Sequence, residues 1–151
     1  MLLYLVRHGK AEAGADDRAR GLTGKGRSSV ERVARRLQKA DVRPERIEHS
    51  GLVRARQTAE ILQSALGGEL TEASDLYPDA DVASAADRLG QEDDGAVMLV
   101  GHLPYMAKLT SYLVVGDADV PLLDFATGSV ACLEGQGMGW EVRWFVTPEV
   151  A

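Results

Sequence analysis

The stretch Leu2-Leu3-Tyr4-Leu5-Val6-Arg7-His8-Gly9 decides the fold class. Its first five residues are apolar and rich in strand formers, which predicts a strand buried on both faces. No basic segment precedes this run, so we interpret it as the first strand of the fold and not as a signal peptide. Arg7, His8 and Gly9 follow directly, at the end of a strand where open α/β sheets bind their ligands.

Downstream of this strand, predicted helices alternate with predicted strands. Apolar residues at helical spacing indicate the helices, and short apolar runs indicate the strands. The expected helices are one capped by Thr23, then 53–66, 82–89 and 104–115, and the expected further strands are 47–49, 69–73 and 96–100. Two final runs, 129–133 and 140–146, flank a glycine-rich turn at 135–139 and predict a terminal hairpin. The pattern predicts an α/β three-layer sandwich, with a mostly parallel central sheet flanked by helices and a C-terminal hairpin.

Length and composition restrict the classes of protein. A chain of 151 residues fits one domain, 1–151. The net charge of -6 argues against nucleic-acid binding, and no apolar run approaches the ~20 residues that span a bilayer. Cys132 is the only cysteine, so no intrachain disulfide forms, which fits a reducing cytoplasm. We therefore expect a cytoplasmic protein that binds neither nucleic acid nor membrane, and the composition does not indicate its oligomeric state.

Histidines follow two of the predicted buried strands. His8 comes directly after the first strand and its Arg7, and His102 comes two residues after strand 96–100. Parallel strands end at the same edge of a sheet, so the imidazoles meet in one crevice if these strands are neighbours. Gly9 and Gly101 flank the histidines, and we expect them to allow a sharp turn and a close approach of a ligand to the backbone.

Arginines are predicted at the same edge. Arg7 immediately precedes His8, and Arg54 lies at the start of the helix that follows strand 47–49. Planar guanidinium groups beside histidines, with no carboxylate cluster, predict an anionic ligand, and phosphate is the natural candidate. A metal site would need a third ligand beside the two histidines, and neither strand end offers one, so we expect no metal.

Three other residues of reactive type are interpreted as structural or solvated. His49 lies in a short strand without a flanking motif, which is typical of a packed histidine. Arg56 is two residues from Arg54, so the two side chains face different sides of the helix. Cys132 lies in an apolar strand and is interpreted as a core residue.

Taken together, four segments resemble the histidine phosphatase superfamily, which includes the cofactor-dependent phosphoglycerate mutases. Arg7-His8-Gly9 resembles the signature after the first strand, and Gly21-Leu22-Thr23-Gly24-Lys25-Gly26 the segment that opens the first helix. The stretch Ser50-Gly51-Leu52-Val53-Arg54-Ala55-Arg56-Gln57-Thr58-Ala59 resembles the second signature segment, and Val100-Gly101-His102-Leu103-Pro104 the third. The closest resemblance is to the compact SixA-type phosphohistidine phosphatases, because only 70–96 is available for a lid. A shallow site admits a side chain displayed on another protein.

The resemblance implies a two-step reaction without a cofactor. Neutral His8 attacks phosphorus, and water then hydrolyses the phosphohistidine enzyme. The second ring nitrogen of His8 needs an acceptor, such as the Gly9 carbonyl. Protonated His102 is expected to act as a cationic donor. The implied phosphate contacts are Arg7, Gly9, Arg20, Arg54 and His102.

The general acid of the mutases, a glutamate, has no counterpart in 76–81. Asp79 and Asp81 are the candidates there, and the alternative is a solvated loop. An imidazole leaves easily, because its conjugate acid has a pKa of about 6.5, so a phosphohistidine substrate needs such an acid least. We therefore expect a phosphohistidine phosphatase that acts on a phosphorylated protein, such as a phosphorelay domain. The alternatives are a phosphomonoesterase for small sugar phosphates or nucleotides, and a phosphate-binding module without turnover.

Overall fold

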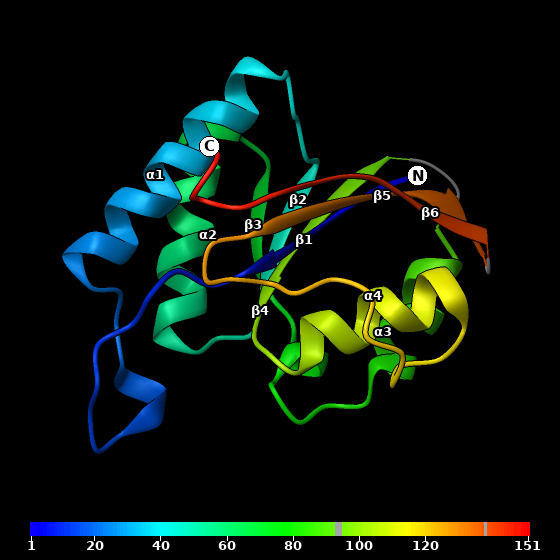
Figure 1. Cartoon of the computed structure of the whole chain (residues 1–151), viewed down its shortest axis with the longest axis horizontal. Coiled ribbons are helices and arrows are strands. Elements are labelled where there is room, and N and C mark those ends of the chain that lie inside the picture. Colours follow the sequence, from blue (N-terminus) through cyan, green and yellow to red (C-terminus); the bar gives the residue numbers. More distant parts are fainter. Residues whose placement is uncertain (93–94, 138) are drawn as a thin grey trace.

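Six strands of the chain form a single sheet in the order β3-β2-β4-β1-β5-β6 (Figure 1). The computed structural model describes residues 1–92, 95–137 and 139–151. The strands are β1 (Leu2–Arg7), β2 (Arg46–His49), β3 (Glu69–Glu72), β4 (Ala96–Gly101), β5 (Val130–Gln136) and β6 (Gly139–Val146). β1, β2, β3 and β4 pair in parallel, whereas β5 is antiparallel to both β1 and β6. The predicted mostly parallel sheet with a C-terminal hairpin is confirmed.

The hairpin reaches further into the glycine-rich stretch than the sequence predicts. Gly135 pairs with Trp140 and Gln136 with Gly139, so glycines expected in the turn belong to the strands. A side chain at Gly135 would collide with the Gly139 carbonyl, so glycine is required here by the close approach of the two strands. Residue 138 of the predicted turn lies outside the described residues.

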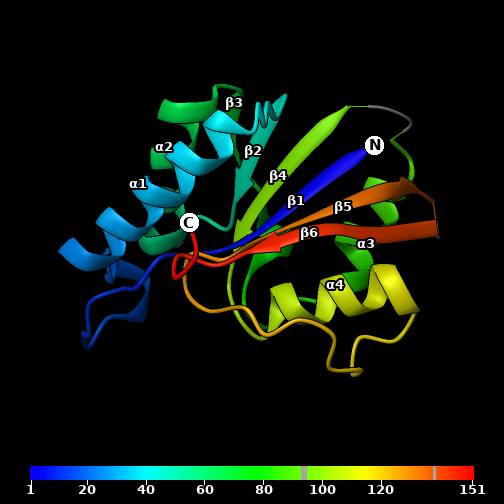
Figure 2. The same cartoon turned by 45° about the horizontal axis from the view of Figure 1, so that its top comes forward.

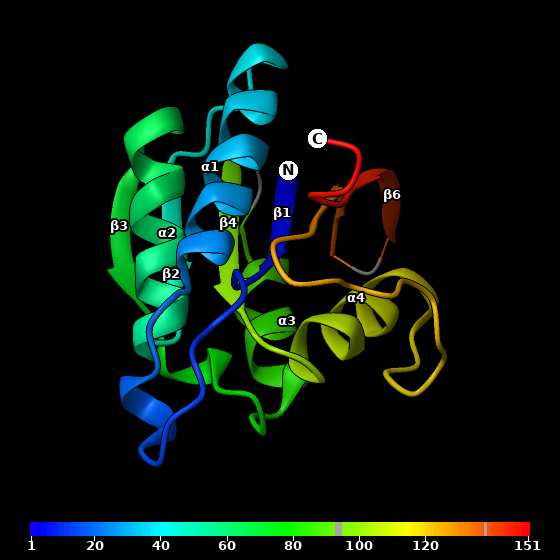
Figure 3. The ribbon, with the colours of Figure 1, turned by 60° about the vertical axis from the view of Figure 1, so that its left-hand side comes forward.

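Helices cover both faces of the sheet, which makes three layers. α1 and α2 pack on one face, and α3 and α4 pack on the other (Figures 2 and 3). The helices are α1 (Gly24–Lys39), α2 (Val53–Leu66), α3 (Val82–Gly90) and α4 (Tyr105–Val115), with short 3-10 helices η1 (Asp17–Ala19) and η2 (Ser74–Leu76). In the described ranges, no helix is long and apolar enough to cross a bilayer.

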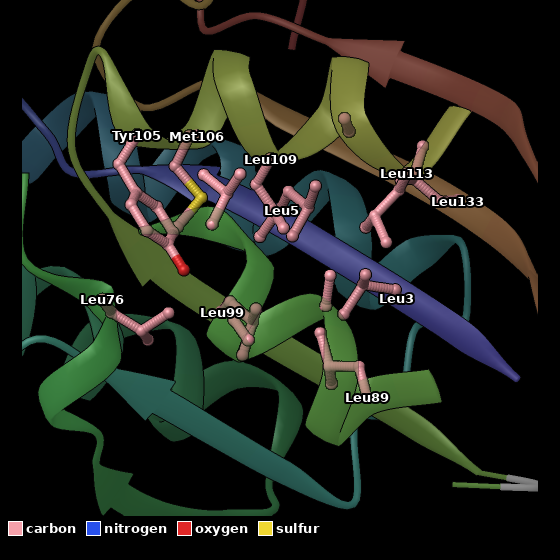
Figure 4. Packing of buried hydrophobic residues seen from close by; sticks show 14 of the residues in the cluster. Leu3, Leu5, Leu76, Leu89, Leu99, Tyr105, Met106, Leu109, Leu113 and Leu133 are labelled. Atoms are coloured by element: carbon pink, nitrogen blue, oxygen red, sulfur yellow. The ribbon is translucent and has the colours of Figure 1, made fainter. Parts of the chain in front are cut away.

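The alternation of side chains along β1 explains why both faces need cover. Leu3 and Leu5 point into the core beneath α3 and α4 (Figure 4), while Tyr4 and Val6 belong to the core beneath α1 and α2. All four side chains are buried, as expected for a strand inside a parallel sheet covered on both faces. The apolar run at the start of the chain therefore lies at the centre of the molecule.

Two helix starts show how local sequence sets the element boundaries. Thr23 caps α1 as predicted, because its hydroxyl oxygen accepts the Gly26 N–H at 2.8 Å. Pro104 is the N-cap residue of α4 and lies just before the helix, not inside its first turn. The helix begins one residue later than the sequence predicts.

Candidate active site

The two histidines that follow β1 and β4 lie side by side. The strands are parallel neighbours in which Arg7 pairs with Gly101, so His8 and His102 both follow at the same edge. Their ring centroids are 5.1 Å apart, with planes inclined by 52°. Both side chains are enclosed, because 9% of His8 and 1% of His102 is exposed. The structure thus brings together the imidazoles of two residues that are distant in the chain.

His8 is held by the backbone around it. Its main-chain N–H donates to the Gly101 carbonyl at 2.9 Å, and its Nδ1 lies 2.6 Å from the Gly9 carbonyl oxygen. A carbonyl can only accept, so Nδ1 carries the proton and Nε2 keeps a lone pair. Burial is the main cause that lowers the pKa of His8 to about 4. The guanidinium groups of Arg54 and Arg7 also lower this pKa, and the Gly9 hydrogen bond opposes the shift. His8 is therefore a neutral imidazole near pH 7.

The glycines beside the histidines serve close packing. Neither Gly9 nor Gly101 has a positive φ, so the backbone conformation does not require glycine at either position. A Cβ on Gly9 would lie 2.7 Å from Val30 of α1, and one on Gly101 would lie 2.6 Å from Met106 of α4. The Gly9 N–H donates to Thr58 Oγ1 at 3.0 Å, so this predicted ligand contact instead fastens the loop to α2.

His102 is bound through a serine that sequence reasoning left without a role. Its Nε2 lies 2.6 Å from Ser50 Oγ, and its buried Nδ1 has no hydrogen-bond partner among the described residues. Burial, followed by the nearby His8 and Arg54, lowers the pKa of His102 to about 3. The expectation of a protonated His102 therefore does not hold in this structure, because an enclosed imidazole beside other cations stays neutral.

The two predicted phosphate-binding arginines are each fastened by one part of the guanidinium group. Arg7 Nη1 donates to the Phe125 carbonyl at 2.8 Å. Arg54, in the first turn of α2, donates from Nη1 to the Asp17 carbonyl at 2.9 Å and from Nη2 to Asp17 Oδ2 at 3.3 Å. In both side chains Nε is buried without an acceptor in the described part of the chain. Such unsatisfied N–H groups are costly, so an anion that accepted from them would remove the penalty.

Asp17 of η1 is a site residue that the sequence did not indicate. Its carboxylate accepts from Arg20 Nε at 3.0 Å as well as from Arg54, and Arg54 is the main cause of its lowered pKa. Arg20 also contributes to the low pKa values of His8 and His102. Asp17 lies in a polar segment without periodicity, so only the three-dimensional structure reveals that it links Arg20 and Arg54.

The structure does not bring the two candidate acids to this cluster. Asp81 is the N-cap of α3, where Oδ1 accepts the Ala83 N–H at 3.0 Å. Asp79 is exposed. In the described contacts neither aspartate forms a hydrogen bond or ion pair with His8 or His102.

The three residues interpreted as structural or solvated lie as expected. His49 is buried, and its Nδ1 accepts the Gly51 N–H at 3.1 Å. Arg56 is exposed and lies 3.6 Å from Glu60. Cys132 is a buried free thiol, and burial raises its pKa to about 11.

The arrangement is suited to phosphoryl transfer through a histidine. A neutral imidazole with a free lone pair is a nucleophile, and the spare N–H groups around it are donors for the oxygens of a phosphoryl group. Within ranges 1–92, 95–137 and 139–151, no three His, Cys, Asp or Glu side chains gather as a metal site.

Comparisons with known proteins define the class. Residues 3–77 match the sequence pattern of the histidine phosphatase superfamily (branch 1). An uncharacterized protein of Picosynechococcus is 37% identical over 123 residues, which cover 77% of this chain and 74% of that protein. The chain belongs to the histidine phosphatase superfamily and is a phosphatase enzyme.

Solved structures narrow the resemblance to SixA-type members. The protein histidine phosphatase SixA complexed with tungstate is 27% identical, with a TM-score of 0.91 and 99% of both chains covered. The putative phosphohistidine phosphatase SixA of Agrobacterium tumefaciens is 29% identical, with a TM-score of 0.83 and 97% of both chains covered. A mycobacterial glucosyl-3-phosphoglycerate phosphatase, at 20% identity and a TM-score of 0.72, shares the fold. The predicted resemblance to the SixA type is confirmed.

Proposed function

We propose that this chain, acting as one domain over 1–151, is a phosphohistidine phosphatase for a histidine displayed on another protein. The observation that carries the proposal is the state of His8: Nδ1–H is bound by the Gly9 carbonyl, and Nε2 is free beside two arginines with spare N–H groups. The similarity to the protein histidine phosphatase SixA and to the putative phosphohistidine phosphatase SixA of Agrobacterium tumefaciens supports the same substrate class. The proposed place of action is the cytoplasm.

The proposed reaction has two steps. His8 Nε2 attacks phosphorus while the P–N bond of the substrate breaks, and the substrate imidazole leaves as a neutral ring because its distal nitrogen carries a proton. Water then attacks phospho-His8, releasing inorganic phosphate and restoring neutral His8. Both protons of the attacking water remain with the phosphate product.

The proposed phosphate contacts come from the groups that surround His8. The buried N–H groups of Arg7 and Arg54 would donate to the equatorial oxygens, and His102 would donate as a neutral ring. Arg20, held by Asp17, would add positive charge at the rim, and Gly9 would act through His8. Because the donors are held before substrate arrives, little reorganisation is needed during the reaction.

Neither of the two candidate acids in 76–81 lies beside His8, which favours phosphohistidine over an alkyl phosphate as the substrate. Asp81 is used in a helix cap and Asp79 is exposed, so the described residues of 76–81 provide no carboxyl group beside His8. An alkoxide leaving group depends strongly on a proton donor, whereas an imidazole with a conjugate-acid pKa of about 6.5 does not.

The test is turnover of a phosphohistidine protein and of an alkyl phosphate by the wild type, His8→Ala and His49→Gln. We expect the wild type to prefer the phosphohistidine protein and to carry acid-labile phosphate on His8 during turnover. His8→Ala should show neither activity nor label. His49→Gln changes a buried histidine outside the cluster and should retain both.

Two results would replace the proposal with an alternative. Equal efficiency on the alkyl phosphate would indicate a small-molecule phosphomonoesterase. Phosphate binding without turnover or label would indicate a binding module.

A further inference from the structure

Ser50 lies at the point where β2 ends, beside the end of β4. The two strands are parallel neighbours in which His49 pairs with Val100, so Ser50 and His102 come to the same edge. Ser50 is 1% exposed, and its Oγ lies 2.6 Å from His102 Nε2. A short contact between two enclosed side chains fixes the plane of the imidazole ring.

The direction of this hydrogen bond follows from the other contacts of the hydroxyl group. Ser50 Oγ accepts the backbone N–H of Leu52 at 3.4 Å, so its oxygen already has a donor. A serine hydroxyl has a single proton to give, and no other acceptor for it occurs in the described residues. The arrangement is satisfied when Ser50 donates to the Nε2 lone pair of His102.

The direction of the bond determines where the ring proton lies. A neutral imidazole has one N–H and one lone pair, so a lone pair at Nε2 places the proton on Nδ1. Nδ1 of His102 is buried and has no partner in the described part of the chain. It joins Nε of Arg7 and Nε of Arg54, which are unsatisfied in the same way.

We propose that Ser50 is a positioning residue that donates to Nε2 of His102, holds the ring as its Nδ1–H tautomer, and so directs Nδ1–H at a phosphoryl oxygen. The last part rests on the proposed function, whereas the tautomer is a property of the protein without substrate. Without the hydroxyl the ring is free to take the Nε2–H tautomer and to rotate. The donor is then lost although the histidine is intact, as happens when a catalytic imidazole is left in the wrong tautomer.

The direct test is the tautomer of His102, measured by ¹⁵N NMR of histidine-labelled protein at pH 7. The chain has only 3 histidines, so single substitutions assign the signals. We expect Nδ1–H at His102 in the wild type and Nε2–H or a mixture in Ser50→Ala. An Nε2–H signal in the wild type, or an unchanged tautomer in folded Ser50→Ala, would overturn the proposal.

Ser111→Ala is the matched control. Ser111 of α4 is also buried, and its hydroxyl group donates one hydrogen bond, to the Val120 carbonyl at 2.7 Å. Ser111→Ala should lower the free energy of unfolding about as much as Ser50→Ala does, without a change in the tautomer of His102. If Ser111→Ala moved the His102 tautomer equally, the effect would be a general one of lost stability and the proposal would fail.

Kinetics test the catalytic part. Ser50→Ala should lower kcat/KM on a phosphohistidine protein ~10-fold, which is less than the loss of a whole charge-stabilising donor. Full activity in Ser50→Ala despite a changed tautomer would overturn the link to phosphate binding. An inactive wild type would instead contradict the proposed function, and the NMR result would still decide the assignment of the His102 proton.

Discussion

Two arginine clusters of the described residues differ in a way that separates chemistry from stability. At the carboxyl ends of β1 and β4, Arg7 and Arg54 keep buried Nε groups that nothing in the described chain accepts from. On the other side of the sheet, Arg88 of α3 donates to both Glu48 and Asp75, over distances of 2.6 to 3.1 Å. Spare N–H groups, and not the number of arginines, distinguish the first cluster, which is the proposed phosphate-binding site.

The pKa directions in the two clusters agree with this distinction. Burial lowers the pKa of Arg7, because little in the protein stabilises its charge. Burial also opposes the charge of Arg88, but hydrogen bonds to Asp75 and Glu48 outweigh it and raise the pKa. The Arg88 cluster ties η2 and α3 to β2, whereas Arg7 and Arg54 keep N–H groups without an acceptor in the described residues, as the proposed phosphate site requires.

The largest effect expected of a change in either cluster is that of Arg54→Ala. Loss of a charge-stabilising donor should lower kcat/KM on a phosphohistidine protein on the order of 10²-fold or more, with the fold retained. The matched control is Arg56→Ala on the same helix, which removes an exposed guanidinium group and should change kcat/KM little. Equal losses in the two variants, measured by initial rates, would contradict the assignment of Arg54.

The sequence predicts most of the fold because its signals are local. The continuous burial of β1 follows from its unbroken apolar run, and the buried face of α1 follows from the helical spacing of its apolar residues, and both are confirmed. The meeting of His8 and His102 required one further condition, that β1 and β4 be neighbours, which no local pattern states. The strand-end motifs therefore indicate the site residues, and the order of strands in the sheet is needed to show that these residues meet.

The site details that escaped prediction depend on non-local contacts. Asp17 binds Arg54, 37 residues away, from a loop without a periodic pattern. The charge state of His102 depends on burial and on neighbours from other strands and helices, so it could not be taken from the residue type. Gly9 is needed because α1 passes close by, and its packing against Val30 is visible only in the folded chain.

The second expected effect is the resistance of His8 to protonation. With a pKa of about 4, about 90% of His8 is neutral at pH 5, against about 3% for a histidine with the ordinary pKa of 6.5. The neutral form of His8 is the nucleophile, so the fraction of nucleophilic His8 should decrease as the pH falls through about 4. NMR titration of the His8 ring, assigned by loss of the signal in His8→Ala, measures this value.

The same depressed pKa predicts a stability effect with a defined sign. Below pH 6.5 the unfolded chain binds a proton at this histidine and the folded chain does not, so the free energy of unfolding should fall as the pH decreases from about 6.5 to about 4. Titration of the His8 ring near pH 6.5 would contradict both expectations.

A smaller effect is expected from Arg88→Met, and on stability alone. Glu48 is buried and loses one partner but keeps Arg46, and 34% of the Arg88 side chain is exposed, so we expect a loss of about 2 kcal/mol in the free energy of unfolding. Denaturant unfolding measures it. Arg143→Met breaks an exposed pair with Glu134 and should cost less than about 0.5 kcal/mol. A drop in kcat/KM in folded Arg88→Met would remove the distinction between the two clusters.

The smallest effect, at Asp81, decides between a helix cap and a general acid. Its carboxylate accepts the Ala83 N–H at the start of α3, so Asp81→Ala should lower the free energy of unfolding by about 1 kcal/mol and leave kcat/KM unchanged. Asn caps helices as well as Asp but cannot donate a carboxylic proton, so Asp81→Asn should preserve both stability and rate. A general acid predicts the opposite for Asn, a stable protein with lost activity. Unfolding curves and initial rates of Asp81→Ala and Asp81→Asn therefore separate the two roles. A helix cap predicts a loss of stability in Asp81→Ala alone, and a general acid predicts a loss of activity in Asp81→Asn.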